Sequence, residues 1–192
     1  MHGIGSLLDD DHYKMVEDIW AGLEEALDVR GVYVTPFPHF SYHVADHYDL
    51  ERLEPLLQDF AGRTPPFEAM TTGLGIFTEG INPVLYVTVA RSPELSAING
   101  HLWSLLQAAS TGIVGYYHPH VWVPHITLGL GDITRDNLAE AISVLSAWDF
   151  TWQIKIDNIV LLYSEGDTKR DRVQLHCQLS GQRAPPRWPG PG

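Results

Sequence analysis

Apolar residues recur three or four positions apart in four segments of the chain. In the first of these segments the stripe consists of Tyr13, Val16, Ile19, Trp20, Leu23 and Leu27, a pattern typical of an amphipathic helix that packs against a core. Aspartate, serine or threonine residues able to cap a helix stand at the start of each segment. The pattern predicts helices over residues 11–28, 50–60, 93–109 and 135–145.

Between these segments, short runs of apolar and β-branched residues are bounded by glycine, proline and asparagine, which indicates strands. The runs occupy residues 4–8, 32–34, 39–45, 84–90, 125–130, 150–163 and 172–179. Residues 67–79 hold one or two further strands, with a bend or bulge at Gly73 and Gly75. Residues 110–123 have an irregular pattern, Glu165-Gly166-Asp167 is typical of a turn, and Pro55 lies inside the second helix or opens its first turn.

The alternation of helices and strands predicts an α/β or α+β protein whose sheets bury one face against helices. We expect residues 1–180 to form a single domain. From residue 181 to residue 192 the chain is rich in proline and glycine, and we expect a flexible tail there.

Charge restricts the partners that this chain can have. It has 192 residues, of which 12 are basic and 24 acidic, and a net charge of −12. This balance disfavours binding to extended duplex or single-stranded nucleic acid, which requires clustered lysine and arginine. The absence of a long apolar run, of a secretory signal and of a second cysteine beside Cys177 predicts a cytoplasmic protein without membrane association. We also expect a monomer.

Two short segments repeat one pattern 86 residues apart. They are Pro38-His39-Phe40-Ser41 and Pro124-His125-Ile126-Thr127. Side chains alternate between the faces of a strand, so each histidine shares a face with the hydroxyl residue two positions later. The repeat predicts two similar halves that face each other across a cleft containing two imidazoles and two hydroxyls.

This set of groups suits phosphate chemistry. A neutral imidazole removes a proton from attacking water, while a protonated imidazole donates to the departing oxygen. The hydroxyls can donate to the nonbridging oxygens, where charge builds up during attack. The arrangement calls for no metal ion and no cofactor.

The paired motifs resemble those of the two-histidine phosphoesterase superfamily, also called the 2'-5' RNA ligase or cyclic phosphodiesterase family. The likeness extends over roughly residues 3–180 and includes Gly73-Leu74-Gly75-Ile76-Phe77 and Trp122-Val123-Pro124-His125 in the expected order. It implies a bilobal, pseudo-symmetric α+β fold in which mixed or antiparallel sheets line a central groove and helices pack outside. Ser41 departs from the commoner threonine but keeps the hydroxyl.

The resemblance also implies an activity. The expected reaction is hydrolysis of a cyclic phosphodiester, such as a 2',3'-cyclic nucleotide or the 2',3'-cyclic phosphate end of an RNA, and its reversal would join RNA ends. His39, Ser41, His125 and Thr127 stand at the matching catalytic positions. The expected partner is therefore a small nucleotide or an RNA end, and the alternative is a noncatalytic module that binds a nucleotide or RNA in the same groove.

Three other residues are candidates for contact with the substrate. His43 lies an even number of positions from His39 and Ser41, so it should share their face of the strand. It is a candidate auxiliary donor in the groove, or else a partly exposed strand histidine. Tyr86 and Trp122 are candidates for base stacking or a phosphate hydrogen bond, the alternative being the core.

Closely spaced histidines leave a metal site as an alternative interpretation. His39, His43 and His47 form one such set, and His118 with His120 forms another. Carboxylate or cysteine partners at a known ligand spacing are missing, so we do not expect a metal site.

Overall fold

The computed structural model describes residues 1–163 and 172–182, and the sequence-predicted turn at 165–167 and most of the predicted tail lie outside them. The first described residue of the tail is held in place, because the Gly181 N–H donates to the Thr64 carbonyl at 3.1 Å. In the described part of the chain, none of the helices combines the length and the apolar character needed to cross a bilayer.

Helices form where the capping residues and apolar stripes predict them. The described helices are α1 (Asp10–Leu27), α2 (Leu50–Arg63), α3 (Pro93–Leu106) and α4 (Leu138–Leu145). The side chains of Asp9, Asp49 and Ser92 accept backbone N–H groups in the first turns of α1, α2 and α3.

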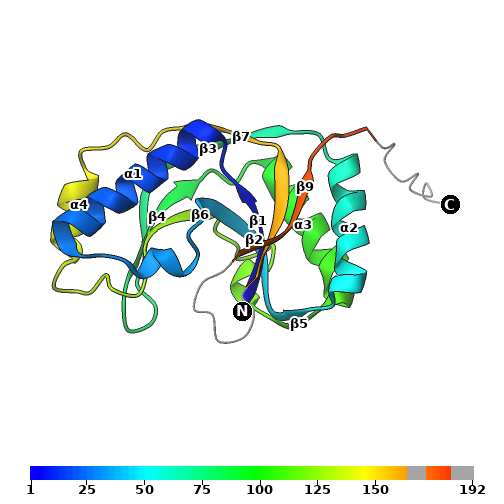
Figure 1. Cartoon of the computed structure of the whole chain (residues 1–192), viewed down its shortest axis with the longest axis horizontal. Helices are drawn as coiled ribbons and strands as arrows, with labels where there is room; N and C mark the ends of the chain where they lie inside the picture. Colours follow the sequence, from blue (N-terminus) through cyan, green and yellow to red (C-terminus); the bar gives the residue numbers. More distant parts are fainter. Residues whose placement is uncertain (164–171, 183–192) are drawn as a thin grey trace.

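Two antiparallel sheets contain all the described strands. The first sheet has the order β5 (Ser110–Ile113), β2 (His39–Tyr48), β1 (His2–Leu7), β8 (Asn158–Tyr163) and β9 (Arg172–Gln178). The second has the order β6 (His125–Gly129), β4 (Val84–Val89), β3 (Phe67–Phe77) and β7 (Gln153–Ile156). Helices α2 and α3 pack against the first sheet and α1 packs against β6 of the second, with α4 beside α1 (Figure 1).

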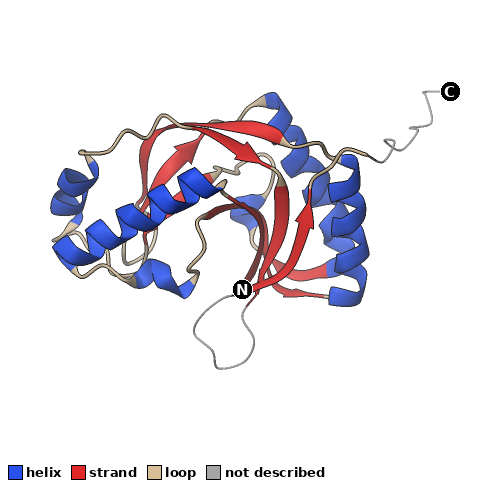
Figure 2. Ribbon diagram, turned by 45° about the horizontal axis from the view of Figure 1, so that its top comes forward, coloured by secondary structure: helices blue, strands red, loops and turns tan. Residues whose placement is uncertain are grey.

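The strands curve around the middle of the molecule, and the helices lie outside them (Figure 2). The predicted α+β fold with two lobes is therefore confirmed. The lobes do not coincide with the two halves of the sequence, however. The first sheet takes β1 and β2 from the start of the chain and β8 and β9 from its end, while β3, β4, β6 and β7 form the second sheet.

Several predicted elements differ from those in the structure. Residues 31–34 form a 3₁₀ helix, η1 (Gly31–Val34), because the N–H groups of Tyr33 and Thr35 bond to carbonyls three residues earlier and need no strand partner. The predicted strand 150–163 is two strands, β7 and β8, which belong to different sheets. The segment predicted as irregular contains β5 and a 3₁₀ helix, η3 (Gly115–Tyr117).

The start of one helix differs from the prediction, and the start of another decides between the two positions predicted for Pro55. Helix α4 begins at Leu138, because Thr134 and Asn137 first bond to each other in a turn. Pro55 lies inside α2, which begins at Leu50.

Bulges in β2, β3 and β6 interrupt the ladders beside the predicted site. In β6, Thr127 pairs with Tyr86 but Gly129 pairs with Leu85, so β6 contains one extra residue, Leu128. In β2, Ser41 pairs with Gly5 but His43 pairs with Ile4, so β2 contains one extra residue, Tyr42. In β3 an extra residue falls between Thr71 and Leu74, and Gly73 there has φ +118°, a conformation that favours glycine. The bulge that the glycines of this segment predict in β3 is thus confirmed, whereas the one in β2 carries no glycine and was not predicted.

Candidate active site

Each motif histidine is the first residue of its strand, and the two rings are held by the same hydrogen bond. His39 opens β2 and its Nδ1 lies 2.5 Å from the carbonyl oxygen of Phe37. His125 opens β6 and its Nδ1 lies 2.8 Å from the carbonyl oxygen of Val123. In both cases a proline separates the carbonyl from the histidine, so the acceptor is the carbonyl two residues earlier.

This hydrogen bond determines which ring nitrogen can react. A carbonyl can only accept, so Nδ1 must carry the proton and donate it. In the neutral ring the lone pair is then on Nε2, and in the protonated ring Nε2 carries the second proton. Both histidines are therefore arranged to exchange protons through Nε2.

The two motif hydroxyls are set beside these rings by the strand pleat. Ser41 pairs with Gly5 across the sheet and is 8% exposed, while Thr127 pairs with Tyr86 and is partly exposed. Within the described residues neither hydroxyl takes part in a hydrogen bond, so both are available as donors to a ligand. Gly5 lets β1 approach the backbone of β2 closely beside Ser41, because a Cβ at Gly5 would lie 2.6 Å from the carbonyl oxygen of Phe40.

One residue of each motif, His39 and Thr127, lines a small pocket of about 130 Å³, whereas Ser41 and His125 are not among its lining residues. Its lining residues are Trp20, Val32, Thr35, His39, Thr127 and Leu130. The histidine of the first motif and the hydroxyl residue of the second thus border the same space, as expected if the two strands share one ligand. Among the described residues, no lysine or arginine lines this pocket, and His39 is the described lining residue whose side chain can carry a positive charge.

Aromatic rings surround His125. Its ring lies edge-on to Phe77 at a centroid distance of 4.9 Å and to Tyr86 at 5.3 Å, and Phe77 and Tyr86 stack on each other at 4.1 Å. Burial lowers the pKa of His125, although the hydrogen bond to Val123 acts in the opposite direction. The neutral form of this ring is therefore favoured.

Tyr86 lies where a groove residue should lie, on the same face of the second sheet as Thr127. A glycine makes room for it, because a Cβ at Gly75 would lie only 2.3 Å from the Tyr86 ring. Tyr86 is only 8% exposed and packs against the His125 ring, and its contact with the substrate stays a prediction.

The prediction that His43 shares a face of the strand with His39 and Ser41 is wrong. The extra residue in β2 turns His43 to the opposite face of the sheet from His39 and Ser41, where it is fully buried. Its Nδ1 is 2.7 Å from the hydroxyl of Tyr48, and its ring contacts Trp103 of α3 at 5.2 Å. His43 therefore belongs to the layer between β2 and α3 and does not line the groove.

Trp122 is also not placed for base stacking. It is 2% exposed, and its indole N–H donates to the carbonyl oxygen of Ser41 at 2.9 Å. The structure thus supports the alternative interpretation of Trp122 as a core residue, although one that contacts the backbone of the first motif.

The histidines considered above as possible metal ligands do not come together in one group. His39 borders the pocket, His43 is buried behind the strand, and His47 is exposed farther along β2. The rings of His118 and His120 lie 4.9 Å apart. Among the residues with described positions, no three histidine, cysteine or acidic side chains are grouped as metal ligands.

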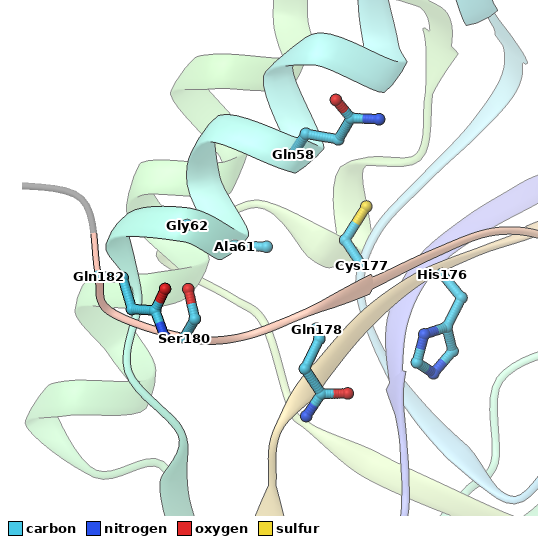
Figure 3. Close-up of a pocket in the computed structure, with 8 residues that line it drawn as sticks. All are labelled: Gln58, Ala61, Gly62, His176, Cys177, Gln178, Ser180 and Gln182. Atoms are coloured by element: carbon cyan, nitrogen blue, oxygen red, sulfur yellow. The ribbon is translucent and has the colours of Figure 1, made fainter.

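A larger pocket, of about 410 Å³, lies between α2 and the end of β9 (Figure 3). Its lining includes Gln58, His176, Cys177, Gln178 and Gln182. None of the predicted site residues reaches it. We therefore assign the site to the smaller pocket, where the two motifs meet.

Sequence reasoning missed three residues of the site. Trp20 and Phe77 were expected only as parts of a helix stripe and a strand, and Gly75 only as a bend. Their roles depend on contacts with residues far along the chain, such as the hydrogen bond from Trp20 to Thr127. In the sequence, the proline directly before each motif histidine was the signal from which the hydrogen bonds between the histidine rings and the backbone carbonyls could have been predicted.

Comparison with known proteins shows which proteins this chain resembles. The profile of the 2'-5' RNA ligase superfamily matches residues 8–168. A protein of Bacillus cereus strain G9842 named "putative phosphoesterase" is 29% identical over 153 residues, which cover 78% of this chain and 83% of that protein.

Solved structures share the fold. TT0787 of Thermus thermophilus superposes with a TM-score of 0.67 at 14% identity and covers 95% of this chain and 99% of its own. LigT of E. coli, solved in complex with 3'-AMP, has a TM-score of 0.61 at 18% identity and covers 93% of this chain and 97% of its own.

Proposed function

This chain belongs to the 2'-5' RNA ligase superfamily, and from this premise we propose that it is a metal-independent phosphoesterase that hydrolyses a cyclic phosphodiester. The substrate class is a 2',3'-cyclic nucleotide or an RNA end that carries a 2',3'-cyclic phosphate. The observation that carries the proposal is the shared pocket, which His39 of one motif and Thr127 of the other line together. The 3'-AMP in the LigT structure, a ribonucleoside monophosphate, is consistent with this substrate class.

His125 is the general base in the proposed reaction. Its surroundings favour the neutral ring, whose lone pair is on Nε2 because Nδ1 donates to Val123. Nε2 takes a proton from water as the water oxygen attacks phosphorus.

His39 is then the general acid. With both ring nitrogens protonated, it donates from Nε2 to the ribose oxygen as the P–O bond to that oxygen breaks. The water proton ends on His125, the His39 proton ends on the new ribose hydroxyl, and the product is a phosphomonoester.

Ser41 and Thr127 donate to the nonbridging oxygens of the phosphate. Negative charge grows there as the attacking oxygen adds, and a fixed donor of this kind contributes on the order of 3 kcal/mol to the transition state. If a terminal RNA hydroxyl takes the place of water, the same groups run the reaction as ligation.

The roles of the histidines are tested with His39→Ala and His125→Ala, assayed on 2',3'-cyclic AMP in the presence of a chelator. We expect the wild type to turn over and each variant to lose about 10²- to 10⁴-fold in kcat, because each removes one proton transfer. On a 4-nitrophenyl ester of a 2'-deoxynucleoside 3'-phosphate, which has no 2'-hydroxyl to attack in place of water and whose leaving group needs no proton, the loss in His39→Ala should become much smaller. The loss in His125→Ala should persist.

His47→Ala is the matched control, since His47 is an exposed histidine on the same strand, and it should retain full activity. Full activity in either site variant would contradict the mechanism. Binding of 3'-AMP by the wild type without turnover of any cyclic phosphate would instead favour the noncatalytic module.

A further inference from the structure

We propose that Trp20 and Trp122 are positioning residues, each of which holds the hydroxyl-bearing residue of one motif through its backbone carbonyl. This inference rests on the proposed phosphoesterase function. It concerns how the two hydroxyls are brought to the correct separation on opposite sides of one phosphate.

Trp122 makes the first of these contacts. Its indole N–H donates to the carbonyl of Ser41 at 2.9 Å, and its ring packs beside Tyr42 at 5.8 Å. This carbonyl lies at the bulge of β2, where the ladder is irregular. The next carbonyl, that of Tyr42, also accepts from a side chain, the amide of Asn99 at 3.0 Å. Side-chain donors thus replace strand pairing at the point where β2 carries its hydroxyl.

Trp20 makes the corresponding contact with the second motif. Its indole N–H, projecting from α1, donates to the carbonyl of Thr127 at 3.0 Å. Strand β6 is at the edge of its sheet, so the backbone on one side of this strand has no neighbouring strand. Trp20 is 4% exposed and lines the same pocket as His39 and Thr127.

The two contacts are reciprocal along the sequence. Trp20 comes before the first motif and holds the second, whereas Trp122 lies two residues before the second motif and holds the first. The segment of Trp122 is itself fixed, because the Trp122 carbonyl accepts from Arg91 at 3.4 Å and the Pro124 carbonyl accepts from the Val89 N–H at 3.1 Å. A shift of Trp122 would therefore change the placement of Ser41 relative to His125.

Positioning of this kind should act on the chemical step. A displacement of about 1 Å at the reacting groups can cost about 100-fold in rate while leaving substrate binding nearly intact. We therefore expect loss of either indole donor to lower kcat more than it raises KM.

The test compares Trp20→Phe and Trp122→Phe with Trp152→Phe. Phenylalanine keeps an aromatic ring and removes the N–H donor. Trp152 is the matched control, because it is 6% exposed and its indole N–H donates to the carbonyl of Asp149 at 2.6 Å, yet it does not line the pocket. With 2',3'-cyclic AMP as substrate, we expect Trp20→Phe and Trp122→Phe to lose about 10- to 100-fold in kcat with KM within about threefold of wild type. Trp152→Phe should keep the wild-type kcat.

A double-mutant cycle checks that Trp122 acts through Ser41. In a Ser41→Ala background the change Trp122→Phe should have little further effect on kcat, because the hydroxyl that it positions is gone. In a Thr127→Ala background it should keep its full effect. If Trp122→Phe does not fold, β-(3-benzothienyl)alanine at position 122 keeps the shape of the indole and removes only the donor.

Three outcomes would overturn the inference. They are an unchanged kcat in both tryptophan variants, an equal loss in Trp152→Phe, or a full effect of Trp122→Phe in the Ser41→Ala background. A wild-type protein that turns over no cyclic phosphate would contradict the proposed function itself, and the two failures are therefore distinguishable.

Discussion

The two motif histidines have the same tether and different surroundings. Both rings donate from Nδ1 to the carbonyl two residues earlier, and Phe77 and Tyr86 pack against His125. One motif can therefore supply a base and the other an acid although their sequences are nearly alike. The sequence predicted the pairing of each histidine with a hydroxyl, but it could not predict this difference, because the aromatic residues come from β3 and β4.

The aromatic enclosure predicts a shift in the pH profile. Because burial lowers the pKa of His125, the base should remain neutral somewhat below pH 6.5, and kcat/KM should fall only as the pH drops through that lowered pKa. Phe77→Ala lets water reach the ring, so the pKa of His125 should rise toward 6.5 and the acidic limb should move to higher pH. Measurement of kcat/KM against pH tests this, with an NMR titration of the His125 ring as a readout independent of activity. If the acidic limb of the pH profile does not move in Phe77→Ala, Phe77 does not control the pKa of His125.

The buried ring of His43 should make the stability of the protein depend on pH. Burial lowers the pKa of His43 from 6.5 to about 4, so below pH 6.5 the unfolded chain binds a proton at this position that the folded chain does not bind. The free energy of unfolding should therefore decrease as the pH falls from 6.5 toward 4, by up to about 3 kcal/mol from this group. The lowered pKa of His125 acts in the same direction. Urea unfolding at a series of pH values measures the slope.

His43→Gln should reduce that slope, because the side chain at position 43 no longer titrates. His47→Gln, at an exposed position on the same strand, should leave the slope unchanged. Equal slopes in wild type and His43→Gln would mean that this buried ring does not govern the pH dependence of stability.

At the scale of elements, the junction between η1 and the loop after β6 should be the most sensitive to added bulk. Gly31, at the start of η1, lies so close to the backbone that a Cβ there would be 1.6 Å from the carbonyl oxygen of Leu130. Asp132 accepts the N–H of Gly31 at 2.7 Å and joins the same two segments. These contacts hold η1 against the loop that follows β6, where Val32 and Leu130 line the pocket.

We expect Gly31→Ala to lower the free energy of unfolding by about 1–3 kcal/mol or more, because the backbone must move to admit the methyl group. Gly22→Ala is the matched control. A Cβ at Gly22, inside α1, meets no atom within 4 Å, so this change should stabilise the protein by about 0.5–1 kcal/mol. Chemical denaturation of the two variants tests the comparison, and equal effects would show that the junction tolerates displacement.

Elements were predictable from the sequence to the extent that their causes are local. Caps and apolar stripes located α1, α2 and α3, since the capping contacts of Asp9, Asp49 and Ser92 span three residues. The bulge of β2 was not predictable, because it arises from pairing with β1 and changes the face of His43 without any glycine to mark it. The single apolar run over 150–163 likewise gave no sign that the chain changes sheets within it.

At the scale of the whole molecule, the repeated motif correctly indicated two lobes but not how the chain builds them. Similar motifs 86 residues apart suggested that each half of the sequence forms one lobe. In the structure, β1 lies between β2 and β8, and β7, from late in the chain, pairs with β3 of the second sheet. Such long-range pairings leave no local pattern, so the sequence alone could not reveal this exchange of strands.

The central position of β1 has a consequence for synthesis on the ribosome. Strands β1 and β2 emerge early and can pair at once, but the other edge of β1 has to wait for β8, at residues 158–163. Until translation has passed that point, the nascent chain carries an open edge on which another chain could pair. The region around Ser41 is therefore completed late, and a chaperone that shields β1 during translation would protect it.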